Sequence, residues 1–312
     1  MSSQLKTIVI GANGKVGKAT LSALASRHAG KVETYAGTRD PSKFDVTGMG
    51  GVKVVSADMA DKDSLTKVLQ GFDCVFLVVP GHEQRTEWAI NGIEAAKAAK
   101  IKFLLVLSVL TSGTDSIFGK QFEPIERQTK ESGIDYAIIR LPLFIDNNFA
   151  KAGSIKGQGT FYDPSDPTKV NTAVAVADIG KVAADILADP MSHVGKTYKL
   201  VMPAYSLNDL AAAFTKCLGR EITHTRVTYK VAKETFVGAG LPEWRVDGIM
   251  ELYRYIDEGN PIMNEADTGD IARITGEEAM TVEQWVEAAT SFYQAEEYHQ
   301  DYYLRTGQAR FI

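Results

Sequence analysis

Short apolar runs alternate with helical patterns along the first half of the chain. The runs are rich in Val, Ile and Leu and predict buried strands at 6–10, 32–38, 52–56, 74–79, 103–108 and 134–141. Apolar residues at helical spacing predict helices at 18–28, 61–69, 83–99 and from near Pro124 to Ser132. This alternation predicts an α/β fold, a doubly wound parallel sheet with helices on both faces.

The pattern is less regular after residue 150. The expected helices are 177 to about 189, 206–218, 241–258 and 282 to about 303. Asp178, Ser206 and Thr281 are the expected N-caps of the first, second and fourth of these helices. Strands are expected at 196–201 and 221–227, and the Gly-, Pro- and Asp-rich stretch 153–167 predicts a hairpin and loop.

These patterns predict two parts. Residues 1–150 should form the parallel-sheet domain, and residues 151–312 a smaller α+β domain. We expect the second part to pack closely against the first around one cleft, and it could return strands to the sheet. No function is predicted for the tail 295–312.

A glycine-rich turn joins the first expected strand to the first expected helix. Gly11 permits a tight turn, Gly14 lets the backbone approach a pyrophosphate, and Gly17 allows the helix to pack closely on the strand. The N–H groups and the positive end of the helix dipole would then face the phosphates. The order strand, turn, helix favours a dinucleotide site over a merely structural turn. The turn consists of Gly11, Ala12, Asn13, Gly14, Lys15, Val16 and Gly17.

The end of the second strand selects between the two nicotinamide cofactors. A carboxylate there binds the ribose 2′-OH of NAD, whereas an arginine nearby accommodates the 2′-phosphate of NADP. Gly37 and Thr38 end the strand and Arg39 follows, whereas Asp40 comes one residue too late for the usual carboxylate. Arg39, with added charge from Lys43 and Lys15, favours NADP(H). The alternative is that Arg39 is only a solvated loop charge.

Composition narrows the classes of protein further. The chain has 312 residues, a net charge of −5 and a sequence pI of about 5.6, which argues against a nucleic-acid partner. Cys74 and Cys217 are its only cysteines, so neither a disulfide framework nor a cysteine metal site is expected. No signal-peptide pattern and no run of 18 apolar residues is present, so we expect a cytoplasmic protein without membrane contact.

Several segments together resemble the NmrA-like family of atypical short-chain dehydrogenases, over about residues 5–293. The resemblance implies a Rossmann domain at 1–150 that binds NADP(H), and a smaller substrate or partner domain over the cofactor. The matching segments are Gly11-Ala-Asn-Gly-Lys-Val-Gly17, Thr38-Arg-Asp-Pro-Ser-Lys43, Ala57-Asp-Met-Ala-Asp61, Val75-Phe-Leu-Val-Val-Pro80, Glu131-Ser-Gly-Ile-Asp-Tyr136, Arg140-Leu-Pro-Leu-Phe-Ile-Asp-Asn147, Ala177-Asp-Ile-Gly-Lys181, Leu241-Pro-Glu-Trp244 and Ile274-Thr-Gly276.

The same resemblance implies a role for each cofactor-binding segment. The glycine turn would contact the pyrophosphate, and Arg39 and Lys43 the 2′-phosphate. The remaining contacts would be Asp58 and Met59 with the adenine, Val79, Pro80 and Gly81 with the ribose and nicotinamide, and Phe144 and Asn147 at the border of the nicotinamide pocket.

Candidate catalytic residues lie at two places in the sequence. Short-chain dehydrogenases use a Tyr-x-x-x-Lys pair, but Tyr229 and Lys233 lie far beyond the fifth strand and make a chance match. Relatives outside the classical group carry a lysine or histidine at a position that falls on Phe122 here. Lys120, two residues earlier, is the candidate catalytic residue, and a solvated loop lysine is the alternative.

Two functions are therefore expected. The first is an NADPH-dependent oxidoreductase that reduces quinones, dyes or related carbonyl compounds as small-molecule hydride acceptors. A highly activated acceptor needs little from the protein beyond binding and orientation. The alternative is a non-catalytic NADP(H)-binding redox sensor with a regulatory protein partner, because Phe122 departs from the family pattern. No metal is expected, since the five histidines show no metal-ligand spacing.

Overall fold

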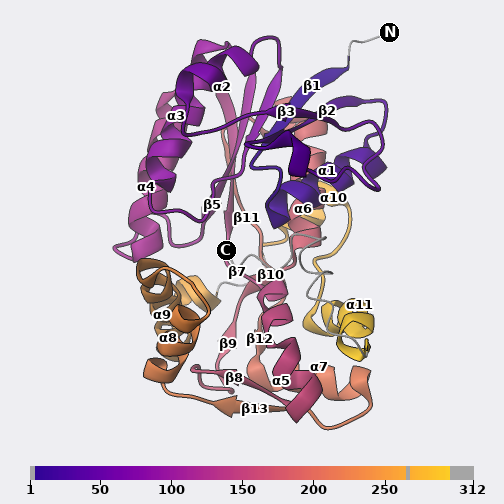
Figure 1. Cartoon of the computed structure of the whole chain (residues 1–312), viewed down its shortest axis with the longest axis vertical. Helices are drawn as coiled ribbons and strands as arrows, with labels where there is room; N and C mark the ends of the chain where they lie inside the picture. The colour runs from indigo at the N-terminus through magenta and orange to yellow at the C-terminus, as the bar shows by residue number, and fades with distance from the viewer. Residues whose placement is uncertain (1–3, 265–267, 296–312) are drawn as a thin grey trace.

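A seven-stranded parallel sheet forms the centre of the molecule in the computed structural model, which describes residues 4–264 and 268–295 (Figure 1). Every pair of neighbouring strands in this sheet is parallel. In spatial order the strands are β11 (Lys196–Lys199), β6 (Asp135–Leu141), β5 (Phe103–Val109), β4 (Cys74–Leu77), β1 (Leu5–Ile10), β2 (Val32–Thr38) and β3 (Lys53–Ser56).

The order of the strands places the ligand crevice. β1 lies in the middle, the chain first moves outward through β2 and β3, and it then returns to the other side of β1 with β4. This is the dinucleotide-binding strand order, in which ligands bind outside the carboxyl ends of the strands where the direction reverses. In this sheet the reversal falls between β1 and β4, so the predicted Rossmann-type sheet is confirmed.

Helices cover both faces of the sheet (Figure 1). One face carries α2 (Lys62–Val68), α3 (Arg85–Ala98) and α4 (Ile117–Glu131), and the other carries α1 (Lys15–Arg27) and α6 (Val176–Ala188). Gly180 lets α6 approach α1 closely, because a Cβ there would lie 2.7 Å from the backbone of Ala19. The close approach buries the apolar side chains between the sheet and the two helices.

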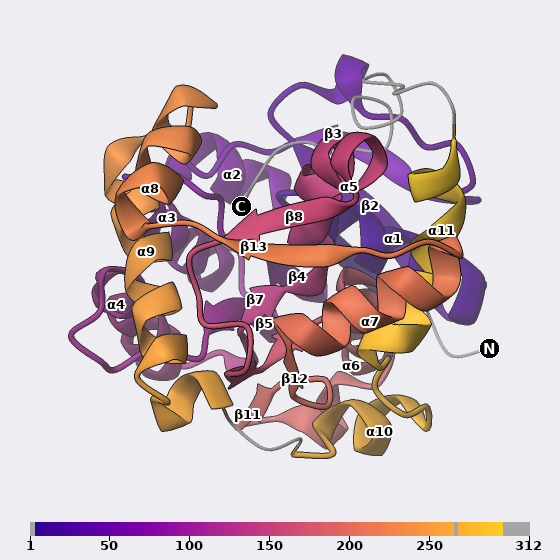
Figure 2. The same cartoon turned by 90° about the horizontal axis from the view of Figure 1, so that it is seen from below.

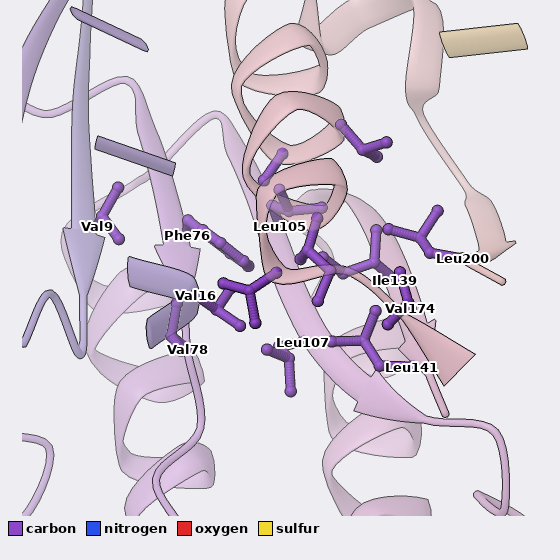
Figure 3. Packing of buried hydrophobic residues seen from close by; sticks show 14 of the residues in the cluster. Val9, Val16, Phe76, Val78, Leu105, Leu107, Ile139, Leu141, Val174 and Leu200 are labelled. Atoms are coloured by element: carbon purple, nitrogen blue, oxygen red, sulfur yellow. The ribbon is translucent and has the colours of Figure 1, made fainter. Parts of the chain in front are cut away.

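Apolar side chains from both layers meet in one continuous core. Phe76, Leu105 and Ile139 from neighbouring strands are fully buried, and Val16 from α1 packs near them (Figure 3). Strands buried on both faces read as unbroken apolar runs, which is why the sequence predicted them well.

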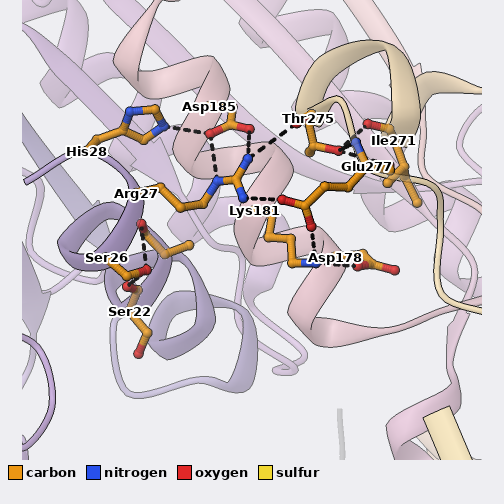
Figure 4. A network of polar contacts seen from close by, with 11 residues as sticks. Ser22, Ser26, Arg27, His28, Asp178, Lys181, Asp185, Ile271, Thr275 and Glu277 are labelled. Carbon is orange, nitrogen blue, oxygen red and sulfur yellow. Dashed lines mark hydrogen bonds and ion pairs between the residues drawn. The ribbon is translucent and has the colours of Figure 1, made fainter. Parts of the chain in front are cut away.

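Polar contacts fix α1 to α6 and to the segment after α10 (Asp270–Thr275) (Figure 4). Arg27 donates to both carboxylate oxygens of Asp185, at 3.1 and 2.8 Å, and to Glu277. Lys181 of α6 also donates to Glu277, at 2.7 Å. These two cations hold the pKa of Glu277 at about 2, well below its ordinary value.

The remaining elements lie mainly below the carboxyl ends of the strands, apart from β11, which joins the sheet, and α6 and α10, which lie beside it (Figure 1); Figure 2 shows the lower elements from below. β8 pairs with β13 and β7 with β10, both in parallel, while β9 and β12 are antiparallel. The elements not yet given are β7 (Leu143–Phe144), α5 (Ala152–Gln158), β8 (Thr160–Asp163), β9 (Val170–Asn171), β10 (Ala173–Val174), β12 (Tyr205–Ser206), α7 (Leu207–Leu218), β13 (Thr223–Arg226), α8 (Tyr229–Gly238), α9 (Glu243–Asp257), α11 (Val282–Gln294) and the 3₁₀ helices η1 (Pro41–Lys43), η2 (Ile145–Lys151), η3 (Pro190–His193) and η4 (Pro261–Asn264).

Two predicted boundaries are wrong. Ser116 caps α4 by accepting from the Gly119 N–H at 2.9 Å, so this helix begins well before Pro124 and contains it. Asp178 is not an N-cap, because α6 begins at Val176. Its carboxylate instead accepts from the Met280 N–H at 2.9 Å.

Two further predictions about elements are wrong, and two caps are confirmed. The stretch 153–167 holds α5 and β8 in place of a hairpin, because β8 finds its partner in the distant β13. The last helix ends at Gln294, before the expected Tyr303, and residues 296–312 lie outside the described part. The capping boxes at Ser206 and Thr281 are present.

Candidate functional site

The glycine turn lies at the reversal of strand order. Gly11 has a φ of +83°, and a Cβ there would lie 2.5 Å from the Val78 carbonyl oxygen, so the turn touches the chain that leaves β4. The N–H groups of Gly11 and Ala12 both donate to the Gly37 carbonyl at 3.2 Å, and Asn13 Nδ2 donates to Thr38 Oγ1 at 2.7 Å. Contacts to β2 and to the residue after β4 therefore hold the turn in this conformation without a ligand.

The turn leads directly into α1. Gly14 is the N-cap and gives the helix no side-chain cap, and Val16 is buried beneath it. A Cβ on Gly17 would lie 2.6 Å from the Gly11 carbonyl oxygen, so only glycine lets the helix sit this close to the turn. The first N–H groups of a helix without a side-chain cap are free to bind an anion.

Lys15 adds positive charge beside this helix end. Burial lowers the pKa of its ammonium group, and the neighbouring Arg245 lowers it further, while Asp146 opposes the shift. A phosphate at the turn would offset both unfavourable effects, because it would supply a countercharge. The turn and Lys15 therefore fit a pyrophosphate group.

Arg39 and Lys43 follow β2 on the surface. Arg39 is exposed and has no hydrogen-bond or ion-pair partner among the described residues. Asp40 caps η1 by accepting from the Ser42 N–H at 3.1 Å, and it lies 3.0 Å from Lys43 Nζ. The Asp40 carboxylate therefore binds within its own loop, and the Arg39 guanidinium is the group available to a 2′-phosphate.

Two more predicted segments lie at neighbouring strand ends. Asp58 follows β3 and accepts from the Ala60 N–H at 3.0 Å, and Met59 beside it is buried. Val79, Pro80 and Gly81 follow β4 and lead to α3, with Val79 buried and Gly81 exposed. The structure brings these strand ends to the same edge as the glycine turn.

A cavity of about 590 Å³ lies at the carboxyl ends of β5 and β6 and extends between the sheet and the lower elements. Its upper wall includes 109–111 and 141–144, and Asn147 also lines it. Phe144 is buried there, and the Asn147 Oδ1 atom is buried without a hydrogen-bond partner among the described residues. An unsatisfied buried acceptor beside a cavity fits a ligand that donates a hydrogen bond.

Sequence reasoning missed the polar lower wall of this cavity. Lys151 and Asp163 form an ion pair at 2.9 Å with little exposure of either side chain. Tyr205 and Tyr253 also line this wall, and burial raises the pKa of both phenols. These residues come from separate elements after residue 150, so only the tertiary fold brings them together.

The candidate catalytic lysine lies elsewhere. Lys120 is on the first turns of α4, its side chain is 66% exposed, and it lies 3.9 Å from Asp115 Oδ1. It does not line the cavity, and Phe122 is buried on the same helix. Tyr229 and Lys233 share α8 but contact different carboxylates, since Tyr229 donates to Asp257 and Lys233 lies 2.7 Å from Asp247.

In residues 4–264 and 268–295, no cluster of His, Cys, Asp and Glu side chains is arranged to hold a metal ion. Each helix in these residues is too short or too polar to span a bilayer.

Known proteins share both the sequence and the fold. NAD(P)H azoreductase of Xenophilus azovorans is 28% identical over 284 residues, which is 90% of this chain and 96% of the relative. Quinone oxidoreductase 2 of Escherichia coli (strain K12) is 28% identical over 80% of this chain and 86% of its own. The structure of the NADPH-dependent quinone oxidoreductase from Escherichia coli in complex with NADPH superimposes with a TM-score of 0.77, at 25% identity, over 91% of this chain and 99% of that one.

The family model of the NmrA-like family matches residues 3–297. That match includes the glycine turn, all seven strands of the sheet and the residues that line the cavity. The chain therefore belongs to the NmrA-like family.

Proposed function

We propose that the protein is an NADPH-dependent reductase of quinones, dyes or related carbonyl compounds. The observation that carries this proposal is the largely apolar cavity at the carboxyl ends of β5 and β6, on the same sheet edge as the glycine turn. A crevice at this edge is where open α/β sheets bind their ligands. The azoreductase and quinone oxidoreductase relatives support the same reaction class.

The proposed cofactor is NADP(H), and this chain has residues that would contact each of its parts. Gly11 to Gly17 and Lys15 would hold the pyrophosphate, and Arg39 with Lys43 the 2′-phosphate. When bound, NADPH supplies a hydride. Asp58 and Met59 would border the adenine, and Val79, Pro80, Gly81, Phe144 and Asn147 the ribose and nicotinamide.

The protein's own contribution would be binding, orientation and exclusion of water. Apolar side chains such as Leu110, Leu252 and Ile256 line the cavity and favour a flat aromatic acceptor over water. A quinone that gains the hydride and one proton from water becomes the hydroquinone, and NADP⁺ remains. The balance requires no acid from the protein. Lys120, the candidate proton donor for less activated carbonyl compounds, does not line the cavity and would have to move to reach a substrate there.

Two measurements test this proposal. Calorimetry should show that the protein binds NADPH and NADP⁺ much more tightly than NADH. A panel of quinones, azo dyes and triphenylmethane dyes should then give NADPH oxidation above background, and Lys120→Met should leave quinone turnover intact. If every acceptor fails in the presence of bound NADPH, the reductase assignment is wrong.

A non-catalytic redox sensor is the second candidate. The observation that favours it is Phe122, a buried aromatic residue where enzymatic relatives are expected to carry lysine or histidine. A sensor must differ in affinity or conformation between the oxidised and reduced cofactor. Pull-down of protein partners with NADPH, with NADP⁺ and without cofactor separates the two: equal recovery in all three contradicts the sensor.

A further inference from the structure

Two buried arginines, one of which lines the cavity, have no carboxylate partner among the described residues. Arg85 begins α3 and is 4% exposed, and Arg245 lies in the first turn of α9 and is 8% exposed. No Asp or Glu of the described residues lies within ion-pair distance of either guanidinium. Buried charges in proteins are normally paired, because an isolated one is costly to desolvate.

Aromatic rings surround Arg85 in place of an acid. Its guanidinium carbon lies 5.6 Å from the ring centroid of Phe118, 5.2 Å from that of Phe122 and 5.3 Å from that of Trp244. Gly248 makes room for this arrangement, since a Cβ there would lie 2.6 Å from Phe118. Ring faces attract a cation and hold its plane, but they carry no net charge to neutralise it. Arg85 also lines the cavity itself.

The side chains around Arg85 carry more hydrogen-bond donors than they have acceptors. Arg245 Nη2 and Trp244 Nε1 are both buried and have no partner among the described residues. Among the described residues, the Arg85 guanidinium donates one hydrogen bond, from Nε to the His82 carbonyl oxygen at 3.3 Å. Unsatisfied buried donors of this kind point to a missing acceptor.

The carboxylates of α9 near this site contact groups other than the two arginines. Glu243 and Asp247 lie 3.0 and 2.7 Å from Lys233 Nζ on α8. Glu251 accepts from the Ile117 N–H at 2.8 Å. Burial and, to a smaller extent, the charge of Arg245 together lower the pKa of Arg85 to about 10. The two guanidinium groups thus lie close enough for their charges to interact, and no Asp or Glu in the described part of the chain pairs with either.

We propose that Arg85 and Arg245 bind an oxyanion substituent of the hydride acceptor, a carboxylate, sulfonate or phosphate group, so that anionic acceptors are the preferred substrates. This inference rests on the proposed reductase function. Arginine is suited to the role because its planar fork of donors matches two oxygens of such a group. The aromatic rings beside Arg85 hold the fork in place and shield the contact from water.

The test compares a charged acceptor with a neutral one. For wild type and for Arg85→Gln, Arg245→Gln and Arg85→Lys, kcat/KM is measured with naphthoquinone sulfonate and with the parent naphthoquinone, and the NADPH Kd is measured by calorimetry. Either glutamine variant should lower the sulfonate-to-parent ratio of kcat/KM by about 10- to 100-fold, as expected for a lost hydrogen bond to a charged group. Arg85→Lys should lose less, because it keeps the charge.

Arg127→Gln is the matched control. It removes the same charge from the exposed side of α4, where Arg127 pairs with Glu123 at 3.0 Å, so the ratio should not change. An equal loss with both acceptors would show that the arginines only hold α3, α4 and α9 together, and would overturn the proposal. A weaker NADPH Kd with an unchanged ratio would also overturn it, because the pair would then bind a cofactor phosphate.

A second measurement does not depend on turnover or on the folding of any variant. Wild-type protein loaded with NADP⁺ should bind naphthalene sulfonate at least about tenfold more tightly than the neutral naphthalene methanol. Equal affinity for the two probes contradicts the anion site. Preferential binding of the sulfonate without reduction of any acceptor would support the anion site and contradict the reductase function, so the two failures can be told apart.

Discussion

Replacing Arg39 by alanine should weaken NADPH binding selectively. Arg39 is exposed and has no partner within the described residues, so its removal leaves no buried acid without a countercharge. Exposed substitutions of this kind change the free energy of unfolding by less than about 0.5 kcal/mol. Any change in cofactor affinity can therefore be attributed to the lost contact and not to a damaged fold.

The size of the effect follows from the exposure of the site. A hydrogen bond to a charged group is worth about 1.5–3 kcal/mol, or about one to two decades of affinity. The position of Arg39 at the surface lets water and salt screen the contact, so we expect the lower end, about tenfold at physiological ionic strength. The loss should grow at low salt. The Kd for NADH, which lacks the 2′-phosphate, should barely change.

Calorimetric titration of both cofactors into wild type, Arg39→Ala and Lys43→Ala provides the assay. Lys43 is more than three-quarters exposed and already paired with Asp40, so its removal should cost less than that of Arg39. Arg127→Ala controls for the change in net charge. A loss of equal size for NADPH and NADH would refute the reasoning, because Arg39 would then support the loop and not the phosphate.

Three further predictions concern stability. Gly17→Ala should destabilise the fold by about 1–3 kcal/mol in urea unfolding, because its Cβ would lie 2.6 Å from the Gly11 carbonyl oxygen; an unchanged midpoint would contradict this packing. Glu126→Gln should lower the free energy of unfolding by about 2–4 kcal/mol, since the buried carboxylate accepts from Arg140 at 2.8 and 2.6 Å. A decrease of less than about 1 kcal/mol would show that the pair is not needed for stability. Glu277 has a folded-state pKa of about 2 against an ordinary 4.5, so its contribution is present above pH 4.5 and lost as the pH falls towards 2. Glu277→Gln should accordingly reduce the fall in unfolding midpoint between pH 5 and pH 3, and an unaltered pH dependence would rule this residue out.

The sheet could be predicted from the sequence because its strands are buried on both faces. Such strands read as continuous apolar runs, and each is followed by a helix with a recognisable periodicity. The glycine turn was equally visible, since tight backbone contacts such as that of Gly11 with Val78 leave no choice of residue. The start of α4 was missed because Pro124 resembled a first-turn residue, and Ser116 gave the weaker signal.

The lower part and much of the cavity could not be predicted in the same way. β8 pairs with β13, a strand far along the chain, and no local pattern announces a pairing of that kind. The Arg85 and Arg245 site has the same origin: each arginine looks like an ordinary helix charge in the sequence. Only the tertiary packing around α3, α4 and α9 shows that both are buried, with no acidic partner in the part of the chain that the structure describes.

The position of β11 late in the sequence also affects how the sheet forms during synthesis. β6 ends at Leu141, but the strand that pairs with its outer edge does not begin until Lys196. Until that segment has left the ribosome, Ile138 and Ile139 lie on an edge strand whose N–H and C=O groups are unpaired on one side. An apolar edge of this kind can pair with other chains, so the nascent protein is most prone to aggregation, and most in need of a chaperone, while α5, β8 and α6 are being added.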